Sequence, residues 1–228
     1  MNKSKFVRDI PAFVELTDEQ SNLLAARLGV QTFERSDLIF DQGSVGSTLY
    51  IIIDGQVRIF TVNETGQELA VTIFRQGDFF GELALLDGQP RSASAEAMQL
   101  TTTLTLHRSG FLDLIGTCPP VAVAVLEALA SRLRHTNNYV EHLTSQPAPQ
   151  RVVQQLVALA TNAHSKYNQT DSIDLRLTQE DLASLSGTTR ETVNRVLSTL
   201  RDQGLIRIAR ARISVLNLEQ LRQKLMQS

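Results

Sequence analysis

The chain has 228 residues, of which 42% are hydrophobic and 20% are charged, as is typical of a globular protein with two modest domains. No run approaches the roughly 18 apolar residues that a membrane-spanning helix needs, and residues 1–10 are too charged for a secretory signal. We therefore expect a cytoplasmic protein that does not contact a membrane.

Residues suited to metal binding or catalysis are scarce. Cys118 is the single cysteine, which excludes an internal disulfide and a multi-cysteine metal or iron–sulfur site. A cupin-like metal enzyme would need several histidines and carboxylates on strands, and only His107 lies in the β-rich region. Walker loops, dinucleotide fingerprints and nucleophile elbows are also missing. We expect no metal and no enzyme activity, with the cupin-like enzyme as a distant alternative.

The formal charge of −2 is unevenly distributed along the chain. Residues 1–145 hold 11 Lys and Arg against 17 Asp and Glu, whereas residues 146–228 hold 11 against 7. The C-terminal third therefore has a net charge of +4, the sign expected of a domain that binds nucleic acid.

The N-terminal half predicts a helix followed by an antiparallel β domain. Residues 12–28 read as a short helix with Thr17 as its N-cap and Gln20 completing a capping box. The apolar runs that follow are short and β-branched: TLYIIID, GQVRIFTV, ELAVTIF and TTTLTLHR. Glycines 12, 11 and 11 residues apart punctuate them, at Gly43, Gly55, Gly66 and Gly77. The spacing indicates a jelly roll, and Asp54-Gly55 is a strong hairpin-turn signal.

A long helix is predicted from Pro119 to about residue 145. Seven positions, all but one of them apolar, step by 4, 3, 4, 3, 4 and 3 along it, as in a coiled-coil seam: Ala122, Leu126, Leu129, Leu133, Thr136, Val140 and Leu143. Homodimerisation through residues 119–145 is the economical interpretation, with a helix lying on its own β domain as the alternative. Thr136, beside Asn137, is polar where its neighbours are apolar. It either fixes the register of the seam or marks a bound polar group.

The prolines of TSQPAPQR (144–151) predict a linker, followed by a helix over 151–163 and a loop at YNQTDSID (167–174). Two helices around a tight turn then follow within 177–206. Thr178 and Asp181 form a capping-box pattern, Leu182, Ala183 and Leu185 give the first helix an apolar face, and the turn is Ser186-Gly187-Thr188. This arrangement predicts a helix-turn-helix.

The second of these helices begins near Thr189 and has an apolar face made by Val193, Val196, Leu197 and Leu200. Four further residues project together from its first turns, at the end of the helix that reads base edges in helix-turn-helix proteins: Arg190, Glu191, Asn194 and Arg195. The alternative is a solvated face with a Glu191–Arg195 ion pair. After Gly204, LIRIARARISVL predicts two short strands that present Arg207, Arg210 and Arg212 to a phosphate backbone, or else a solvated edge.

These features together resemble the cyclic AMP receptor protein family, also called catabolite activator proteins, over nearly the whole chain. The resemblance implies an α+β protein with three parts: a β jelly-roll cyclic-nucleotide-binding domain (1–118), a dimerisation helix (119–145) and a winged helix-turn-helix domain (146–228). It implies a homodimeric transcription regulator that binds double-stranded DNA at a palindrome of TGTGA half-sites, is gated by cyclic AMP and contacts RNA polymerase.

In this resemblance FGELALLDGQPRSA is the phosphate-binding cassette, which implies a nucleotide site at Gly81, Glu82, Leu83, Ala84, Arg91 and Ser92. Arg91 would neutralise the cyclic phosphate, Ser92 would donate to it, and Glu82 would accept a bond from the ribose 2′-OH. The alternative for Glu82 and Arg91 is a structural ion pair. Thr136 and Asn137 match the polar pair that contacts the base, one residue from each subunit.

TTRETVNR resembles the recognition helix of the family, which assigns base contacts to Arg190, Glu191 and Arg195. The set expected at DNA also includes Thr178, Thr189, Asn194 and the three strand arginines. Two positions depart from the family pattern. The hairpin tip ARAR lacks the common glycine, and Asn137 stands where some members have serine. Gating by cyclic GMP or a cyclic dinucleotide, activity without a ligand, and a purely dimerising scaffold stay open as alternatives.

Overall fold

The computed structural model describes residues 3–10, 13–167 and 172–226, with the backbone only at 135, 142–144, 162–167 and 226. The chain divides into two compact units, Met1–His135 and Thr136–Ser228. The boundaries expected at residues 118 and 145 stay predictions. Among the described residues no single helix is long and apolar enough to cross a membrane, although Arg108–Thr117 and Pro119–Glu141, bent by 112°, meet that test as a pair.

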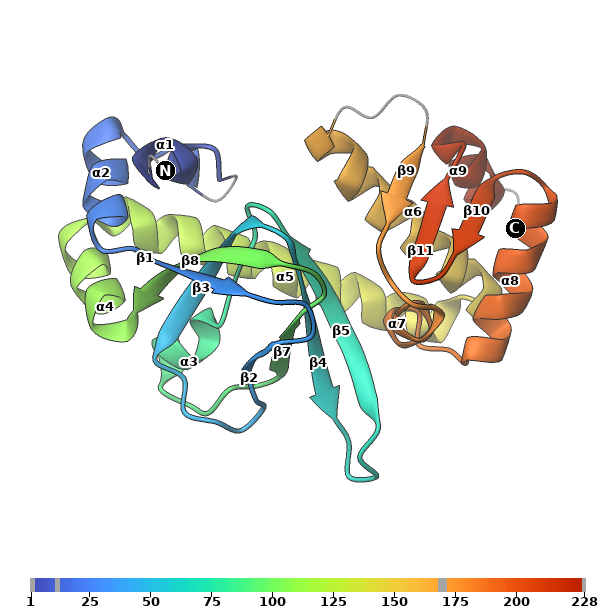
Figure 1. The fold of residues 1–228 in the computed structure, drawn as a ribbon, viewed down its shortest axis with the longest axis horizontal. Coiled ribbons are helices and arrows are strands. Elements are labelled where there is room, and N and C mark those ends of the chain that lie inside the picture. Colours follow the sequence, from blue (N-terminus) through green and yellow to red (C-terminus); the bar gives the residue numbers. More distant parts are fainter. Residues whose placement is uncertain (1–2, 11–12, 168–171, 227–228) are drawn as a thin grey trace. The chain divides into compact units, whose positions relative to one another are not determined.

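The first unit contains two four-stranded antiparallel sheets (Figure 1). One sheet has the order β1-β8-β3-β6, with bounds Gly29–Phe33, Thr101–His107, Thr48–Asp54 and Phe79–Phe80. The other has the order β2-β7-β4-β5, with bounds Leu38–Phe40, Ser94–Ala97, Gln56–Val62 and Glu68–Arg75. The β-branched runs of the sequence form β3, β4, β5 and β8, so the predicted β domain and the α+β class are confirmed.

Asp54-Gly55 does not form the predicted hairpin. β3 pairs with β8 and β6, whereas β4 pairs with β5 and β7, so the dipeptide carries the chain from one sheet to the other. Gly55 does adopt a φ of 107°, as the turn signal requires. The dipeptide thus predicts the local backbone conformation but not which strands pair. The hairpin lies one step later, where Gly66 turns β4 into β5.

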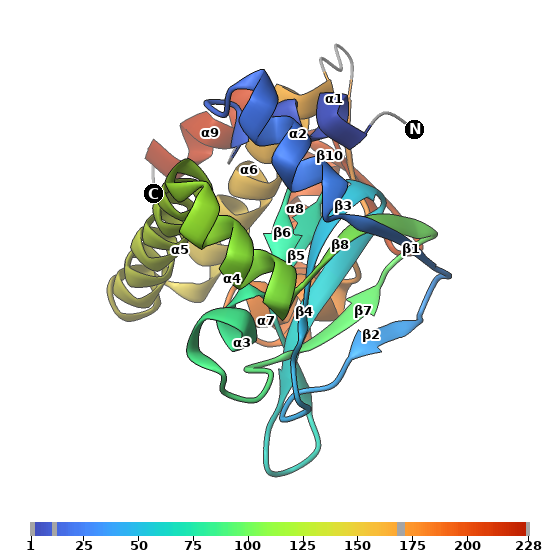
Figure 2. The same cartoon turned by 90° about the vertical axis from the view of Figure 1, so that its left-hand side faces the viewer.

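Helices pack around this sandwich: α1 (Lys3–Arg8), α2 (Asp18–Ala26), α3 (Glu82–Asp87), α4 (Arg108–Thr117) and α5 (Pro119–Ser145). Thr17 caps α2, and its capping box with Gln20 is complete, as predicted. The helix itself is shorter than the predicted 12–28, and residue 12 lies outside the described residues. Figure 2 shows α2 and α4 on the same side of the unit, where Arg27 and Asp113 form an ion pair at 2.5 Å.

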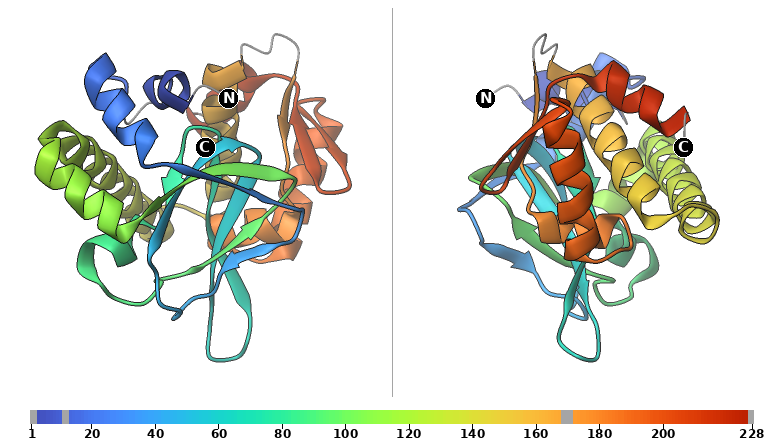
Figure 3. Two further views of the ribbon diagram at one scale, coloured as in Figure 1. Left: turned by 60° about the vertical axis from the view of Figure 1, so that its left-hand side comes forward. Right: turned by 90° about the vertical axis from the view of Figure 1, so that its right-hand side faces the viewer.

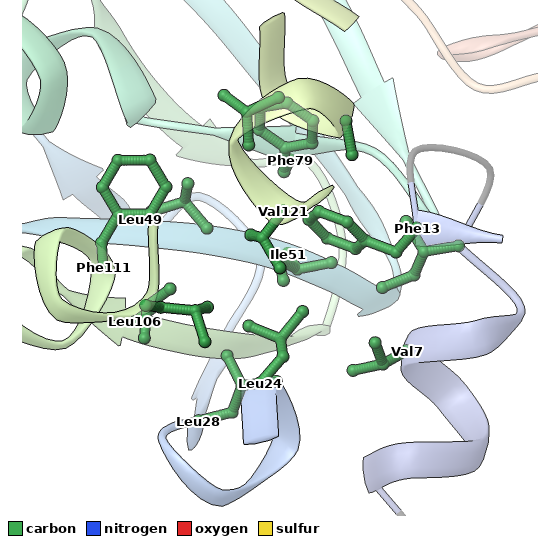
Figure 4. Close-up of a cluster of buried hydrophobic side chains, with 14 of the residues drawn as sticks. Val7, Phe13, Leu24, Leu28, Leu49, Ile51, Phe79, Leu106, Phe111 and Val121 are labelled. Atoms are coloured by element: carbon green, nitrogen blue, oxygen red, sulfur yellow. The ribbon is translucent and has the colours of Figure 1, made fainter. Parts of the chain in front are cut away.

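The main core of the unit joins the N-terminal helices, the β1-β8-β3-β6 sheet, α4 and the first turns of α5 (Figure 4). Phe13, from the segment before α2, stacks on Phe79 of β6 with ring centroids 6.3 Å apart. Phe111 of α4 is 1% exposed, and Val121 fixes the start of α5 in the same cluster. Burial of this α5 face is what holds the helix against the β domain.

The predicted seam of α5 needs a correction at Leu129, which packs against this core. The large apolar side chains that α5 exposes by more than half are instead Val123, Leu126, Leu133 and Val140. Exposed Ala130 and Asn137 fill the spacing, giving steps of 3, 4, 3, 4 and 3. Thr136 and Asn137 are both exposed, and the Leu143 side chain lies outside the described residues. Heptad steps fit two adjacent faces of a helix, and packing selects one.

The second unit is a helical domain with a small sheet of order β10-β11-β9 (Figure 3). Its elements are α6 (Ala148–Tyr167), β9 (Ile173–Leu175), α7 (Gln179–Leu185), α8 (Arg190–Asp202), β10 (Ile206–Ala209), β11 (Arg212–Val215) and α9 (Leu218–Met226). The linker is shorter than predicted, because only Gln146 and Pro147 separate α5 from α6. Residues 168–171 of the predicted loop lie outside the described residues, and residues 173–174 belong to β9, which was not predicted. Neither was α9.

The β10–β11 turn forms without a glycine. Ala211 takes a φ of +54°, a left-handed conformation that costs an L-residue roughly 1–2 kcal/mol. We expect Ala211→Gly to raise the free energy of unfolding by about 0.5–1 kcal/mol, since glycine's greater unfolded-state freedom offsets part of the relief. Urea denaturation measures it. Ala209→Gly, in β10, is the control and should destabilise; equal loss in both variants would contradict the strain.

Candidate functional site

Arg91 occupies the centre of the cassette and is only 6% exposed. Its Nη1 donates to the Gly81 carbonyl and its Nη2 to the Thr48 carbonyl, both at 2.6 Å. The guanidinium lies 4.1 Å from the centroid of the Phe40 ring. Burial lowers the pKa of Arg91, with the charge of Glu82 among the opposing effects. An arginine remains charged even so.

A third donor of this guanidinium, the Nε–H group, is buried and is left without an acceptor among the described residues. Such an N–H group is costly to leave unpaired. The surroundings are the aromatic cluster of Phe40, Tyr50 and Phe80, with Tyr50 and Phe80 stacked at 5.1 Å. In so apolar a setting an opposite charge is attracted more strongly than in water.

Two glycines allow this arginine to lie flat in the site. A Cβ on Gly46 would come within 2.7 Å of Arg91 Nε and 2.6 Å of the Ala84 Cβ. A Cβ on Gly81 would lie 2.6 Å from Arg91 Nη1, and Gly81 also has a φ of +80° as the N-cap of α3. The cassette glycine is therefore required by close approach as well as by backbone conformation.

Glu82 does not pair directly with Arg91. It is 4% exposed, and its Oε1 accepts a hydrogen bond from Arg132 Nη1 of α5 at 2.7 Å. Arg132 Nη2 donates to the Phe79 carbonyl, and the guanidinium lies 4.5 Å from the ring centroids of Phe74 and Phe79. The structural Glu82–Arg91 ion pair considered from the sequence is therefore wrong. The acid of the cassette is tied to the long helix instead.

The other cassette residues differ in exposure. Ala84 is buried at 3%, whereas Leu83 is 44% exposed and Ser92 lies at the surface next to Arg91. Thr136 and Asn137 belong to the second unit, and both are exposed. The structure therefore brings Gly81, Glu82, Ala84 and Arg91 together within one unit; the nucleotide roles of all these residues stay predictions.

In the second unit, α7 and α8 form the predicted helix-turn-helix. Thr178 caps α7 and its box with Asp181 is complete, while Thr189 accepts from the Thr192 backbone N–H at the start of α8. The buried face of α8 is the predicted one, made by Val193, Val196, Leu197 and Leu200. The four predicted reading residues are all exposed: Arg190, Glu191, Asn194 and Arg195. Their contacts with DNA stay predictions, and Thr178 and Thr189 serve structurally as caps.

The arginines of the two strands are exposed as well, at positions 207, 210 and 212. Arg212 forms an ion pair with Asp174 of β9 at 3.3 Å. Ser214 donates to the same aspartate at 2.6 Å. A phosphate group bound by Arg212 would therefore compete with Asp174 for the guanidinium. Arg210 lies in the turn between β10 and β11.

Sequence reasoning missed two residues that contact the cassette, Arg132 and Gly46. Arg132 lies one helical turn before Thr136, and this i,i+4 spacing was the signal that could have placed it on the same face as the suspected polar position. Gly46 carried no such signal, because its role depends on contact with Arg91, 45 residues later. Among the described residues, no group of three or more His, Cys, Asp or Glu is placed to hold a metal ion.

Comparison with known proteins finds one match in the N-terminal part of the chain and another in the C-terminal part. Residues 30–118 match the model of the cyclic nucleotide-binding domain, and residues 150–224 match that of the Crp-like helix-turn-helix domain. The cyclic AMP receptor protein of Thermus thermophilus is 34% identical over 205 residues, which cover 90% of this chain and 92% of the relative. The CRP-like cAMP-activated global transcriptional regulator of Mycobacterium tuberculosis is 34% identical over 87% of this chain and 88% of its own length.

Among solved structures, the Thermus thermophilus catabolite activator protein has a TM-score of 0.55 and 32% identity, covering 95% of this chain and 99% of that one. Both domain models match this chain, and a relative of about the same length is one-third identical to it. Together these matches establish the family. The chain belongs to the cyclic AMP receptor protein family of transcription regulators, with a cyclic-nucleotide-binding domain followed by a DNA-binding helix-turn-helix domain.

Proposed function

We propose that this protein is a homodimeric transcription regulator of the cytoplasm, that cyclic AMP is its effector, and that the liganded dimer binds palindromic DNA with TGTGA half-sites and contacts RNA polymerase. The observation that carries the effector proposal is the buried Arg91 guanidinium, whose Nε has no hydrogen-bond acceptor among the described residues. The cyclic AMP receptor proteins that are 34% identical to this chain support the choice of nucleotide.

The chemistry of the cassette suits a cyclic phosphate. Arg91 would supply the positive charge, Ser92 a hydroxyl donor, and the first turn of α3 backbone N–H groups that lack intrahelical acceptors. Gly81, Leu83 and Ala84 belong to that turn. Glu82 would accept a hydrogen bond from the ribose 2′-OH with a carboxylate whose Oε1 also accepts the bond from Arg132.

The Glu82–Arg132 pair also offers a route from the nucleotide to α5. A 2′-OH bound to Glu82 would compete with or reorient the guanidinium of Arg132, which is held on the Phe74 and Phe79 rings. The nucleotide can shift the protein between conformations only by its differential affinity for them, typically about 1–3 kcal/mol. In the proposed dimer, Thr136 and Asn137 would add contacts to the base, one residue from the α5 helix of each subunit.

The surface of α5 supports the homodimer. Its exposed apolar stripe at Val123, Leu126, Leu133 and Val140 has heptad spacing, as a two-stranded coiled coil requires. Beside its first turns lies a cleft of about 760 Å³ between α5, the Val14–Leu16 segment and the Gly77–Phe79 turn. A second copy of α5 would cover the stripe. To read successive major grooves, the two reading heads of such a dimer must lie roughly 34 Å apart, one turn of DNA.

Calorimetry with cyclic AMP, cyclic GMP and cyclic di-GMP on the purified protein tests the effector. We expect cyclic AMP to bind most tightly, and to raise affinity for a duplex with two TGTGA half-sites by a factor of about 5–150 in gel shifts. Binding of another nucleotide alone would replace cyclic AMP in the proposal. Equal DNA affinity with and without every nucleotide would contradict gating.

Gly46 gives a prediction specific to the cassette. Gly46→Ala places a methyl group within 2.8 Å of the Arg91 guanidinium, so that Arg91 must shift away from its carbonyl acceptors. We expect cyclic AMP affinity to fall about tenfold or more, since a displaced charge-assisted bond contributes about 1.5–3 kcal/mol. Isothermal calorimetry measures the loss. Gly116→Ala, where the new Cβ meets nothing within 4 Å, is the control; unchanged affinity in Gly46→Ala would show that Arg91 does not hold the nucleotide.

A further inference from the structure

One side chain ties the linker after α5 to the turn of the helix-turn-helix. Arg151, in the first turns of α6, uses all three of its guanidinium nitrogens. Nε donates to the Ser186 carbonyl at 2.9 Å, Nη2 to the Gly187 carbonyl at 2.7 Å, and Nη1 to the Gln146 carbonyl at 2.7 Å. Gln146 is one of the two residues between α5 and α6.

The two acceptors in the helix-turn-helix, the Ser186 and Gly187 carbonyls, lie just past the last helical residue of α7, where the helix offers them no N–H partner. Ser186 is the C-cap of α7 and is 1% exposed, and Gly187 turns the chain with a φ of +59°. Carbonyl groups at a helix C-terminus carry negative partial charge, which a guanidinium stabilises. The first residue of α8, Arg190, follows only three residues after Gly187. The three hydrogen bonds of Arg151, called the clamp below, therefore act on the turn that determines where α8 begins.

The end of α5 is electrostatically close to the same guanidinium. Burial raises the pKa of Tyr139, and the positive charge of Arg151 opposes that rise. Tyr139 and Arg151 both belong to the second unit, so the last turns of α5, the linker and the helix-turn-helix turn meet around one cation. A rigid fork with three donors transmits a displacement of the linker to the turn better than a single bond would.

We infer that Arg151 is the positioning residue that couples the end of the long helix to the DNA-reading head. The inference rests on the proposed function, because it assigns the step by which an effector bound in the first unit alters DNA affinity. Arg151 contacts neither nucleotide nor base in this assignment. It holds the α7–α8 turn in a fixed relation to Gln146, so that a movement of α5 is passed on to α8.

The test compares Arg151→Ala with Arg222→Ala in the full-length protein. Arg222 is a half-buried arginine of the same unit that ties α9 to α6 by donating to Thr161. DNA affinity is measured by fluorescence anisotropy on a TGTGA palindrome with and without cyclic AMP, and cyclic AMP affinity by calorimetry. We expect Arg151→Ala to bind cyclic AMP with wild-type affinity. The factor by which cyclic AMP raises its DNA affinity should be at least about fivefold smaller than in the wild type. Arg222→Ala should keep that effect.

Arg151→Lys keeps the charge but loses the fork, and it should restore the cyclic AMP effect only in part. Hydrogen exchange at the amides of 187–190 reports the clamp directly and should become faster in Arg151→Ala alone. If the DNA affinity of the wild type were the same with and without cyclic AMP, the result would contradict the proposed function and, with it, this inference. A gated wild type with an equally gated Arg151→Ala, even one of lower stability, would overturn the inference and leave the proposed function standing.

Discussion

Replacing Arg91 by alanine is expected to abolish high-affinity binding of cyclic AMP. The guanidinium is the buried cation of the cassette, and it donates to the Gly81 and Thr48 carbonyls from a position over the Phe40 ring. A charge-assisted hydrogen bond contributes about 1.5–3 kcal/mol, so the loss of the Nε bond to a phosphate alone lowers affinity about 10- to 150-fold. Calorimetry measures the loss, and gel filtration checks that the proposed dimer is retained.

Arg58→Ala is the matched control for this change. Arg58 is a second partly buried arginine of the β domain, bound to Glu68 and Glu96 and lying over the Phe60 ring. Its removal should lower stability without a comparable loss of nucleotide affinity. Arg91→Lys keeps a positive charge in the cassette and should bind more weakly than the wild type but more tightly than Arg91→Ala. Wild-type affinity in a folded Arg91→Ala protein would show that the phosphate is held elsewhere.

Replacing Arg190 by alanine is expected to remove the preference for one base pair of each half-site. Arg190 is exposed in the first turn of α8, beside the exposed Glu191 and one turn before the exposed Asn194. A two-pronged arginine contact with guanine discriminates between bases by about 1–3 kcal/mol, a factor of roughly 5 to 150. A gel-shift panel with single substitutions at each position of the half-site measures that factor.

Arg201→Ala provides the comparison for the reading helix. Arg201 is exposed in the last turn of the same helix and is paired with Asp202 at 2.9 Å. Its loss should leave the order of preferred bases unchanged. If Arg190→Ala weakened binding to every duplex by the same factor, the residue would be a phosphate contact, and direct reading would pass to Glu191 or Arg195.

Three arginines of the proposed route from the nucleotide site to the DNA-reading head donate to backbone carbonyls. Arg91 holds the cassette, Arg132 joins Glu82 to α5, and Arg151 joins the linker to the reading turn. Each of these side chains makes contacts between segments more than 30 residues apart in sequence. A ligand that alters one such contact changes the relative energies of whole segments rather than of single residues.

The sequence by itself determined the local features of the fold. The capping boxes at Thr17 and Thr178, the apolar face of α8 and the main β-branched strands all depend on neighbours within a few residues. Helical periodicity and cap hydrogen bonds are short-range, so a single stretch of sequence contains everything that they require. The cassette is similarly compact, because Gly81, Glu82 and Arg91 lie within eleven consecutive residues, and the resemblance to the family's phosphate-binding cassette predicted one site for them.

The tertiary structure alone decided which distant surfaces meet. Heptad steps could not choose between the α5 face with Leu129 and the face with Ala130, because adjacent helix faces satisfy them equally until a core buries one. The Asp54-Gly55 turn was compatible with a hairpin until the pairings put β3 and β4 in different sheets. The partners of Glu82 and Arg151 were undetermined for the same reason: which carboxylate or carbonyl a guanidinium reaches depends on packing between segments far apart in sequence.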